Sequence, residues 1–241
     1  MARVRIGTSG WVYRHWRGRF YPEKLPAANW FAFYARHFDT VELNNSFYRQ
    51  PSRKTFESWR AHSPLDFRFA VKLNRYLTHY KRLNLSAGSI ALSYDTMAGL
   101  GPKLAVALAQ LPPRMGFDAA RLETFLRAVA RRRRRHAIEP RDASWLGDEP
   151  LAALRRRNVA LCIIDTPRWP SRLAVTADFV YVRFHGPRGL YASNYPEEEL
   201  RLWADRMRAW RDQELDVFAY FNNDANAYAV FNAMRLRELV G

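Results

Sequence analysis

Ala160-Leu161-Cys162-Ile163-Ile164-Asp165 is a run of five apolar residues that ends in a carboxylate. A strand that is apolar along its whole length is typical of a parallel sheet covered on both faces. Other short runs share this apolar character, and almost all of them end in polar residues: Val4–Gly7, Thr40–Asn44, Phe67–Lys72, Leu104–Leu111, His136–Arg141, Phe179–His185 and Val217–Asn222. Together with the first run they predict eight strands.

Amphipathic segments lie between these runs, and most of them follow a residue that can cap a helix. The capping residues are Asn29, Ser52, Asp118, Asp148 and Asp224. The predicted helices are Trp30–His37, Arg53–His62, Ala119–Arg134, Glu149–Arg157, Pro196–Asp212 and Ala225–Leu239. Thr166–Thr176 is the exception, because Pro167 and Pro170 leave little room for a helix, and we predict mostly loop there.

Strands that alternate with helices predict a parallel sheet, and eight of them predict closure into a TIM-type (β/α)₈ barrel. The length of 241 residues fits one such domain over residues 1–241. The alternative is an open doubly wound sheet, which needs a glycine-rich phosphate loop after its first strand. Gly7-Thr8-Ser9-Gly10-Trp11 lacks the GxGxxG spacing, so the barrel is favoured and no nucleotide-cofactor motif is found.

The composition is that of a globular protein, with 48% apolar and 26% charged residues. The single cysteine, Cys162, cannot form an internal disulfide, so nothing calls for an oxidising compartment. The N-terminus enters a strand directly, and no run of about 18 apolar residues occurs, as a membrane span would require. We expect a soluble cytoplasmic protein without a membrane partner, and the sequence leaves its oligomeric state open.

The net charge of +16 comes mainly from arginine and would attract polyanions. Arg131–Arg135 and Arg155–Arg157, however, each end a predicted helix just before a strand. That position is the N-terminal face of a barrel, away from the usual active site, and cations are favoured at a helix C-terminus. The basic surface is therefore compatible with a nucleic-acid partner, but it does not mark the catalytic site.

Polar residues gather where the predicted strands end, which is the face on which barrel enzymes carry their catalytic groups. Each residue alone could cap a helix or join a salt bridge, but a stabilising network has no reason to gather at one end of every strand. We therefore predict one functional pocket there. Its members are Glu42, Asn44, Lys72, Gln110, Glu139, Arg141, Asp165, Arg183, His185, Asn222, Asn223 and Asp224.

The types of residue in this pocket narrow its chemistry. Glu42, Glu139 and Asp165 offer carboxylates for general acid–base work, and His185 could move a proton near neutral pH. Lys72, Arg141 and Arg183 suit a carboxylate or phosphate on the ligand, since an arginine fork binds such oxyanions through two hydrogen bonds. The competing interpretation, that these cations only neutralise the three carboxylates, stays open.

A divalent metal is compatible with the pocket but not favoured. Carboxylates at Glu42, Glu139, Asp165 and Asp224 could ligate Mg²⁺ or Mn²⁺. The three cations predicted for the same space argue against a tight cation site. Zinc usually recruits several histidines, and this pocket has His185 and His79. We therefore assign no metal ligands and leave the cofactor unknown.

Aromatic side chains occur in the loops that follow the first three strands. Trp11, Tyr48 and His79 lie in these loops and are candidate substrate-binding residues, because aromatic rings can stack on a base or a sugar ring. The alternative is that they pack the loops onto the rim of the barrel, which for Trp11 is equally favoured.

Several segments together resemble the YecE-like family, a domain of unknown function. They are Ile6–Pro22, Phe38–Tyr48, Phe69–Lys72, Thr78-His79, Gln110–Pro113, Ile138-Glu139, Arg141, Ser144-Trp145, Tyr181–Gly186 and Tyr220–Asp224. The resemblance covers essentially the whole chain and implies a TIM barrel. It also implies a pocket at Trp11, Glu42, Asn44, Lys72, His79, Gln110, Glu139, Arg141, Asp165, Arg183, His185 and Asn222.

The chain departs from the family pattern around the fifth strand. Pro140 and Asp142 stand where phenylalanine and histidine are expected. Pro140 lacks an N–H for the sheet, so that strand should end early, and the role of Arg141 is put in doubt.

The resemblance supplies no reaction, so function rests on the predicted pocket. We expect an enzyme, hydrolase or isomerase, that acts on a small anionic or polyhydroxyl substrate such as a sugar phosphate or nucleoside derivative. One alternative is a metal-dependent endonuclease-like phosphodiesterase, by analogy between barrels. The other is a non-catalytic barrel that binds nucleic acid or another ligand.

Overall fold

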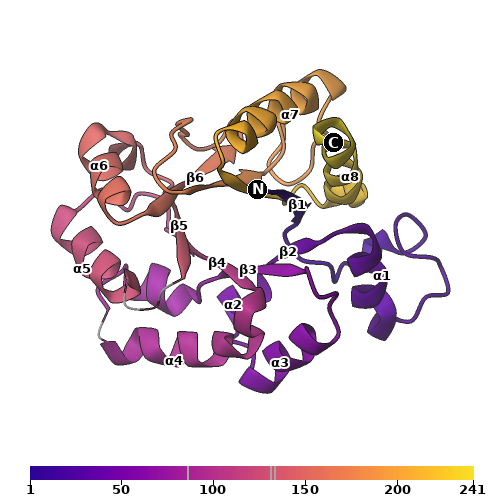
Figure 1. Cartoon of the computed structure of the whole chain (residues 1–241), viewed down its shortest axis with the longest axis horizontal. Coiled ribbons are helices and arrows are strands. Elements are labelled where there is room, and N and C mark those ends of the chain that lie inside the picture. Colours follow the sequence, from indigo (N-terminus) through magenta and orange to yellow (C-terminus); the bar gives the residue numbers. More distant parts are fainter. Residues whose placement is uncertain (86, 131, 133) are drawn as a thin grey trace.

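Eight parallel strands form one sheet that curls into a barrel, with helices around the outside (Figure 1). The structure is a computed structural model that describes residues 1–85, 87–130, 132 and 134–241. The strands are β1 Val4–Thr8, β2 Thr40–Leu43, β3 Arg68–Lys72, β4 Leu104–Gln110, β5 Arg135–Glu139, β6 Val159–Asp165, β7 Phe179–Phe184 and β8 Asp216–Phe221. The TIM-type fold and the eight predicted strands are confirmed.

Strand β5 ends at Glu139 rather than at the predicted Arg141. Pro140 follows at once and has no N–H to donate to a neighbouring strand, which is the physical reason for the early end. The carboxylate of Glu139 therefore lies at the last position of its strand, and Arg141 belongs to the loop above it.

The helices are α1 Trp30–His37, α2 Asn45–Tyr48, α3 Arg53–Ala61, α4 Ala87–Met97, α5 Ala119–Ala130, α6 Asp148–Arg156, α7 Glu197–Asp212 and α8 Tyr228–Val240. All six predicted helices are present, two of them capped as expected by Ser52 and Asp118. The predicted end of the helix Ala119–Arg134 is wrong, because α5 ends at Ala130 and neither Arg132 nor Arg134 is helical. Arg131 and Arg133 lie outside the described residues.

Two connections between strands lack a clear amphipathic pattern in the sequence, the one after β3 and the one after β6. Helix α4 was not predicted, because its serines and glycine give it little contrast between an apolar and a polar face. Residues 166–176, all of which are described, contain no helix, as Pro167 and Pro170 predicted.

The barrel closes between β1 and β2 through close backbone contact. Only Ser9 and Glu42 form a bridge between these two segments in the described chain, so the barrel is nearly closed. A Cβ atom at Gly7 would lie 2.4 Å from the carbonyl oxygen of Thr40. Only glycine permits this approach, which makes Gly7 a requirement of closure.

Two apolar cores hold the fold. The larger lies between the strands and the helices, and the smaller fills the barrel interior, where alternate strand residues point inward. The interior residues include Ala70, Val106, Leu108, Ala137, Cys162, Ile164, Phe179, Tyr181, Phe218 and Tyr220. The interior is thus packed, and polar groups are held at its two ends.

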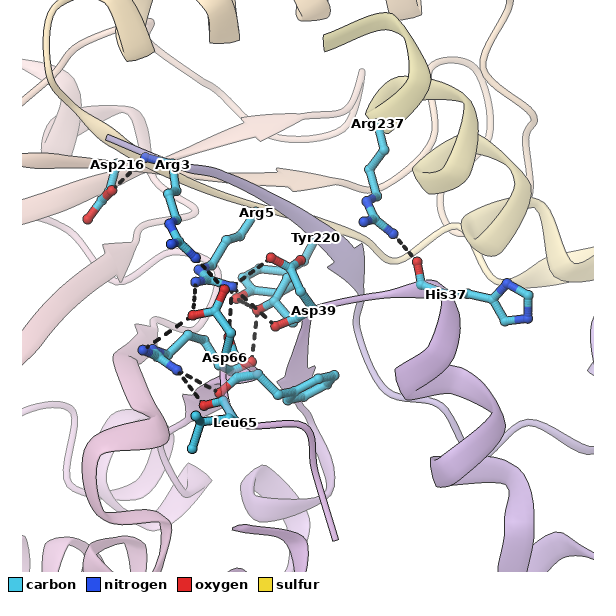
Figure 2. Close-up of polar contacts among 12 residues, drawn as sticks. Arg3, Arg5, His37, Asp39, Leu65, Asp66, Asp216, Tyr220 and Arg237 are labelled. Atoms are coloured by element: carbon cyan, nitrogen blue, oxygen red, sulfur yellow. Dashed lines mark hydrogen bonds and ion pairs between the residues drawn. The ribbon is translucent and has the colours of Figure 1, made fainter. Parts of the chain in front are cut away.

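A paired ion network closes the N-terminal end of the barrel (Figure 2). Arg5 is buried and binds Asp39 at 2.6 Å and Asp66 at 3.1 Å. Arg3 also binds Asp66, and above them the hydroxyl of Thr40 lies 2.8 Å from that of Tyr220. Every side chain in this group has a polar partner, as expected of a structural plug.

No helix in the described ranges is both long enough and apolar enough to cross a membrane.

Candidate functional site

Two buried carboxylates, Glu42 and Glu139, lie at the C-terminal end of the barrel and share one arginine. Nη2 of Arg183 is 2.8 Å from Oε1 of Glu42, and its Nη1 is 2.5 Å from Oε2 of Glu139. The two glutamates are 0% exposed and Arg183 is 1% exposed. Residues from β2, β5 and β7 therefore converge on one charged group, as the sequence predicted.

Further donors complete the coordination of both carboxylates. The Tyr181 hydroxyl donates to Oε2 of Glu42 at 2.6 Å, and the Ser9 hydroxyl donates to its Oε1 at 2.7 Å. Gln110 donates to Oε1 of Glu139 at 3.0 Å, and Arg141 donates to the same oxygen at 3.0 and 3.1 Å. Hydrogen bonds to both oxygens of each carboxylate are what allow these charges to be buried. Nε of Arg183, by contrast, is buried without a partner among the described residues.

Electrostatics keep Glu139 ionised. Burial by itself would raise the pKa of its carboxyl, but Arg183 and Arg141 outweigh this effect and hold the pKa well below its ordinary value. The same two carboxylates stabilise the Arg183 guanidinium and raise its pKa despite burial. Glu139 is thus ionised at neutral pH, which suits positioning better than proton transfer.

Lys72, the last residue of β3, differs from the other charged members. Its side chain is largely buried, at 8% exposed, and its Nζ lies 4.0 Å from the centroid of the Phe47 ring. Among the described residues it has no hydrogen bond or ion pair, while Arg183 and Arg141 pair with Glu42 and Glu139. Burial, with a further contribution from Arg183, lowers the pKa of Lys72 to about 7.

His185 follows β7 and is completely buried. Its Nδ1 lies 3.3 Å from Nδ2 of Asn222, at the end of β8, so Nδ1 accepts and the ring proton is on Nε2. Nε2 lies 3.8 Å from Oε1 of Glu139 and has no hydrogen-bond partner in the described chain. Burial and Arg183 lower the pKa of His185 well below its ordinary value, so the ring is neutral.

Arg141 and Trp169 lie over the buried group. The guanidinium carbon of Arg141 lies 3.6 Å from the centroid of the Trp169 ring, and this ring packs edge-on against His185. Trp169 comes from the loop between β6 and β7. Despite the early end of β5 at Pro140, Arg141 contacts Glu139 from its position in the loop, and its role in binding a ligand stays a prediction.

A cavity of about 760 Å³ adjoins the charged group on the side of β1 and β2. It is lined in part by Ser9, Trp11, Phe31, Asn44 and Trp59. Ser9 connects it to the charged group through its hydrogen bond to Glu42, whereas Lys72 and Arg141 lie outside its lining. Oδ1 of Asn44 is buried without a hydrogen-bond partner among the described residues. Trp11 packs against Phe31 and Trp59, so it forms the wall of this cavity as well as part of the rim.

The remaining predicted aromatic residues surround Phe47. The His79 ring packs edge-on against Phe47 with centroids 4.9 Å apart, and burial together with Lys72 lowers the pKa of His79 to about 4. Tyr48 also packs edge-on against Phe47 but is exposed. His79 therefore lies beside Lys72, and Tyr48 lies at the surface of the mouth.

Asp165 does not join the group, and its predicted placement among the acid–base residues is wrong. Its Oδ2 accepts a hydrogen bond from the indole of Trp203 on α7 at 2.5 Å. Within the sheet Ile164 is level with Arg183, whereas Asp165 is level with Phe184 and points outward with it. Burial raises the pKa of the Asp165 carboxyl.

Asn223 points away from the charged group, so its predicted placement in the pocket is wrong, and Asp224 contacts the loop that follows β1. The Asn223 amide donates to the carbonyl of Ser193 at 2.8 Å and to Asn232 at 2.9 Å, outside the barrel wall. The carbonyl of Asp224 lies 2.7 Å from Nε2 of His15, and its carboxyl has a pKa raised by burial. Asn222 is the member of this segment that reaches the site.

Four residues of the site were not among the predicted ones: Ser9, Phe47, Tyr181 and Trp169. Tyr181 had a signal in the sequence, since it lies two residues before Arg183 and so shares its face of the strand. Trp169 had none, because it lies in a loop without periodicity.

The described part of the chain brings no three His, Cys, Asp or Glu side chains together as a metal site requires. Glu42 and Glu139 bind Arg183, while Asp165 and Asp224 bind other groups. In the described part of the arginine run, Arg132 lies over Tyr94 and Arg135 binds Asp216 at 2.6 Å, while Arg134 is exposed. Binding of nucleic acid by the basic surface stays a prediction.

Comparison with known proteins identifies the family. Residues 5–241 match the family model described as "Protein of unknown function DUF72". The UPF0759 protein YunF of Bacillus subtilis is 28% identical, over 98% of this chain and 94% of its own length. The UPF0759 protein YecE of Escherichia coli K12 is 31% identical over 83 residues, which cover 34% of this chain and 30% of that protein.

Two solved structures share the fold. A DUF72 family protein from Thermotoga maritima MSB8 superposes with a TM-score of 0.85 at 27% identity and covers 99% of both chains. A DUF72 family protein from Enterococcus faecalis V583 superposes with a TM-score of 0.83 at 20% identity, over 98% of this chain and 95% of that one. The barrel with its charged C-terminal end therefore belongs to a member of the DUF72 family.

Proposed function

We propose that this protein is an enzyme that acts on a small anionic or polyhydroxyl substrate, such as a sugar phosphate or nucleoside derivative, at the C-terminal end of the barrel. The observation that carries the proposal is the pair of unsatisfied donors in that end. Nε of Arg183 and Nε2 of His185 are buried among charged groups without a hydrogen-bond partner in the described chain. The largely buried Lys72 amine beside them has no acceptor among the described residues either.

The two ends of the barrel differ in this respect. At the N-terminal end Arg5, Asp39 and Asp66 satisfy one another, as a purely structural network should. At the C-terminal end, three cationic side chains (Lys72, Arg141 and Arg183) face two carboxylates (Glu42 and Glu139). Each buried donor that lacks a hydrogen bond costs about 1–3 kcal/mol. A ligand that brings a negative charge and hydrogen-bond acceptors would satisfy these groups.

The groups divide into positioning and reacting residues. Glu42, Glu139 and Arg183 form a rigid scaffold, and the low pKa of Glu139 argues against the proton-transfer role that its sequence position favours. Lys72 has a pKa of about 7, near the value at which a general acid or base works best at neutral pH. Arg141 would hold the anionic part of the substrate beside it.

The adjoining cavity would take the rest of the substrate. Its walls combine aromatic rings at Trp11 and Trp59 with the unpartnered carbonyl of Asn44. Aromatic faces pack on sugar rings and bases, and a free amide oxygen accepts from a hydroxyl or amino group. This combination supports a polyhydroxyl or nucleoside-like substrate.

A turnover screen tests the proposal. Purified protein is incubated with a panel of sugar phosphates and nucleoside phosphates, and substrate loss is followed by mass spectrometry and ³¹P NMR. We expect turnover of at least one compound, lost in Lys72→Met and retained in Lys103→Met, which alters an equally buried lysine outside the site. Turnover that survives Lys72→Met, or its absence across the panel, would count against the proposal.

A further inference from the structure

We infer that the Nζ of Lys72 is a nucleophile that forms an imine with a carbonyl compound carrying a carboxylate or a phosphate. This inference rests on the proposed function and deepens it, because it assigns a covalent step and a substrate class to the same site. The supporting observations are the partners of the five lysines, the ring under Lys72, and the arginine beside it.

Lys72 and Lys103 have the same burial but opposite bonding. Both are 8% exposed. Nζ of Lys103 donates to the carbonyls of Arg60 and Ser63, each at 2.8 Å, and to the Ser63 hydroxyl at 2.7 Å. All three of its donor positions are therefore used, as a structural ammonium requires. Lys72 has no such acceptor among the residues described, so hydrogen bonds to an ammonium group do not explain its buried position.

The other three lysines, Lys24, Lys54 and Lys81, are exposed. An exposed amine is hydrated and mobile, so it is not held against a bound carbonyl group. Desolvation beside other cations is the arrangement that activates a lysine as a nucleophile. Lys72 combines this arrangement with a small remaining exposure through which a ligand can arrive.

The surroundings of Lys72 suit each state of the reaction. The neutral amine attacks the carbonyl carbon and forms a C–N bond, and a proton moves from nitrogen to oxygen to give a carbinolamine. The C–O bond then breaks, the oxygen leaves as water, and the products are an imine and one water molecule. When protonated, the imine carries the positive charge of the former ammonium, over the same Phe47 face 4.0 Å from Nζ.

The anionic group of the substrate would bind Arg141. Its side chain is 10% exposed at the mouth, and it is fixed by Glu139 and by the Trp169 ring. Attack requires the carbonyl carbon to lie next to Nζ. A carboxylate one bond from that carbon, or a phosphate about three bonds from it, would then face this guanidinium. Oxo acids and keto phosphates have this shape.

Reductive trapping tests the inference. The full chain is treated with sodium borohydride in the presence of pyruvate, dihydroxyacetone phosphate or the neutral probe glycolaldehyde, and the modified residue is located by peptide mass spectrometry. Borohydride adds hydride to the imine carbon and leaves a stable secondary amine. We expect one adduct at Lys72 with pyruvate or dihydroxyacetone phosphate, and the more reactive of these two identifies the anionic group.

Three comparisons make the result specific. Lys103 should remain unmodified in the same digest. Lys72→Arg keeps the charge without a nucleophilic amine and should abolish the adduct, which covers the case in which Lys72→Met does not fold. Arg141→Met should reduce trapping of pyruvate at least tenfold more than trapping of glycolaldehyde (about 1.4 kcal/mol).

The outcomes separate the covalent step from the proposed function. Adducts confined to the exposed lysines, or equal labelling of Lys72 and Lys103, would overturn the imine. If turnover in the substrate screen needs Lys72 while borohydride traps nothing there, Lys72 acts by proton transfer, and the inference fails while the enzyme proposal stands. A yield of Lys72 adduct that increases as pH rises through about 7 supports both the imine and the enzyme proposal.

Discussion

Arg183 on β7 crosses the barrel interior to Glu42 on β2, with 2.8 Å between Nη2 and Oε1. Strands β8 and β1 lie between β7 and β2 in the sheet, so the ion pair joins separate parts of the barrel wall. The other terminal nitrogen of Arg183 binds Glu139 on β5. One guanidinium thus connects three strands, and this connection has consequences for stability as well as for the site.

Removing one charge from this group should be costly. Glu139→Gln leaves Arg183 buried with an incomplete set of anionic partners, and breaking a buried ion pair in this way costs about 3–5 kcal/mol. Glu57→Gln, which removes the exposed pair with Arg53, should cost no more than about 1 kcal/mol. Urea unfolding of both variants measures the difference, and similar losses would show that burial of the Arg183 group is incomplete.

The hydroxyl of Tyr181 should matter more than that of Tyr220. Both tyrosines are buried in the barrel interior, but Tyr181 donates to the charged carboxylate of Glu42, whereas the Tyr220 hydroxyl meets the neutral hydroxyl of Thr40. Tyr181→Phe should cost about 1.5–3 kcal/mol and Tyr220→Phe about 1 kcal/mol. Chemical denaturation gives both values, and a larger loss for Tyr220→Phe would contradict the stronger hydrogen bond assigned to Tyr181.

Stability should depend on pH through Lys72. Its pKa falls from an ordinary 10.5 to about 7 on folding, so between these values the unfolded chain binds more protons than the folded one. The free energy of unfolding contributed by Lys72 therefore increases as pH rises from about 7 to 10 and is lowest below 7.

The measurement compares unfolding at pH 6, 7.5 and 9 for wild type, Lys72→Met and the surface control Lys54→Met. The free energy of unfolding of wild type should increase relative to that of Lys72→Met as pH rises. Its difference from the free energy of unfolding of Lys54→Met should stay constant. A constant difference from both variants would mean that Lys72 stays protonated throughout.

Closure of the barrel should depend on Gly7. Alanine there places a Cβ atom 2.4 Å from the Thr40 carbonyl oxygen, which belongs to the backbone and cannot rotate away. Overpacking of this kind costs about 1–3 kcal/mol. At Gly116 the nearest atom to an added Cβ is Oγ of Ser144 at 3.8 Å, so Gly116→Ala is the matched control and should be nearly neutral. Equal thermal stability of the two variants would refute the close approach.

The sequence predicted the barrel and much of the site because strand ends carry two kinds of information. The apolar runs predicted the eight strands, and the polar residues at their ends predicted Glu42, Lys72, Glu139, Arg183 and their neighbours in the site. In a parallel barrel every strand that ends in a polar residue delivers it to the same face, so convergence follows from topology alone.

The errors came from the direction in which side chains point. Asp165 ends an apolar strand just as Glu139 does, but its pleat position sends it outward to Trp203. Because both faces of these strands are buried, the run 160–164 gives no alternation from which to tell inside from outside. Contacts made by loops, such as Trp169 over Arg141, depend on tertiary packing that no local pattern records.

Inorganic phosphate is the simplest probe of an anion site at Lys72 and Arg141, and its effect on the melting temperature is the most direct test of function at this end of the barrel. At about ten times its Kd, phosphate should stabilise wild type by about 1.4 kcal/mol, a shift of roughly 3–5 °C for a chain of this size. The shift should vanish in Arg141→Met and persist in Arg156→Met, which removes an exposed arginine at the end of α6. Equal shifts in all three proteins would mean that phosphate binds the basic surface and would contradict a ligand site in the barrel mouth.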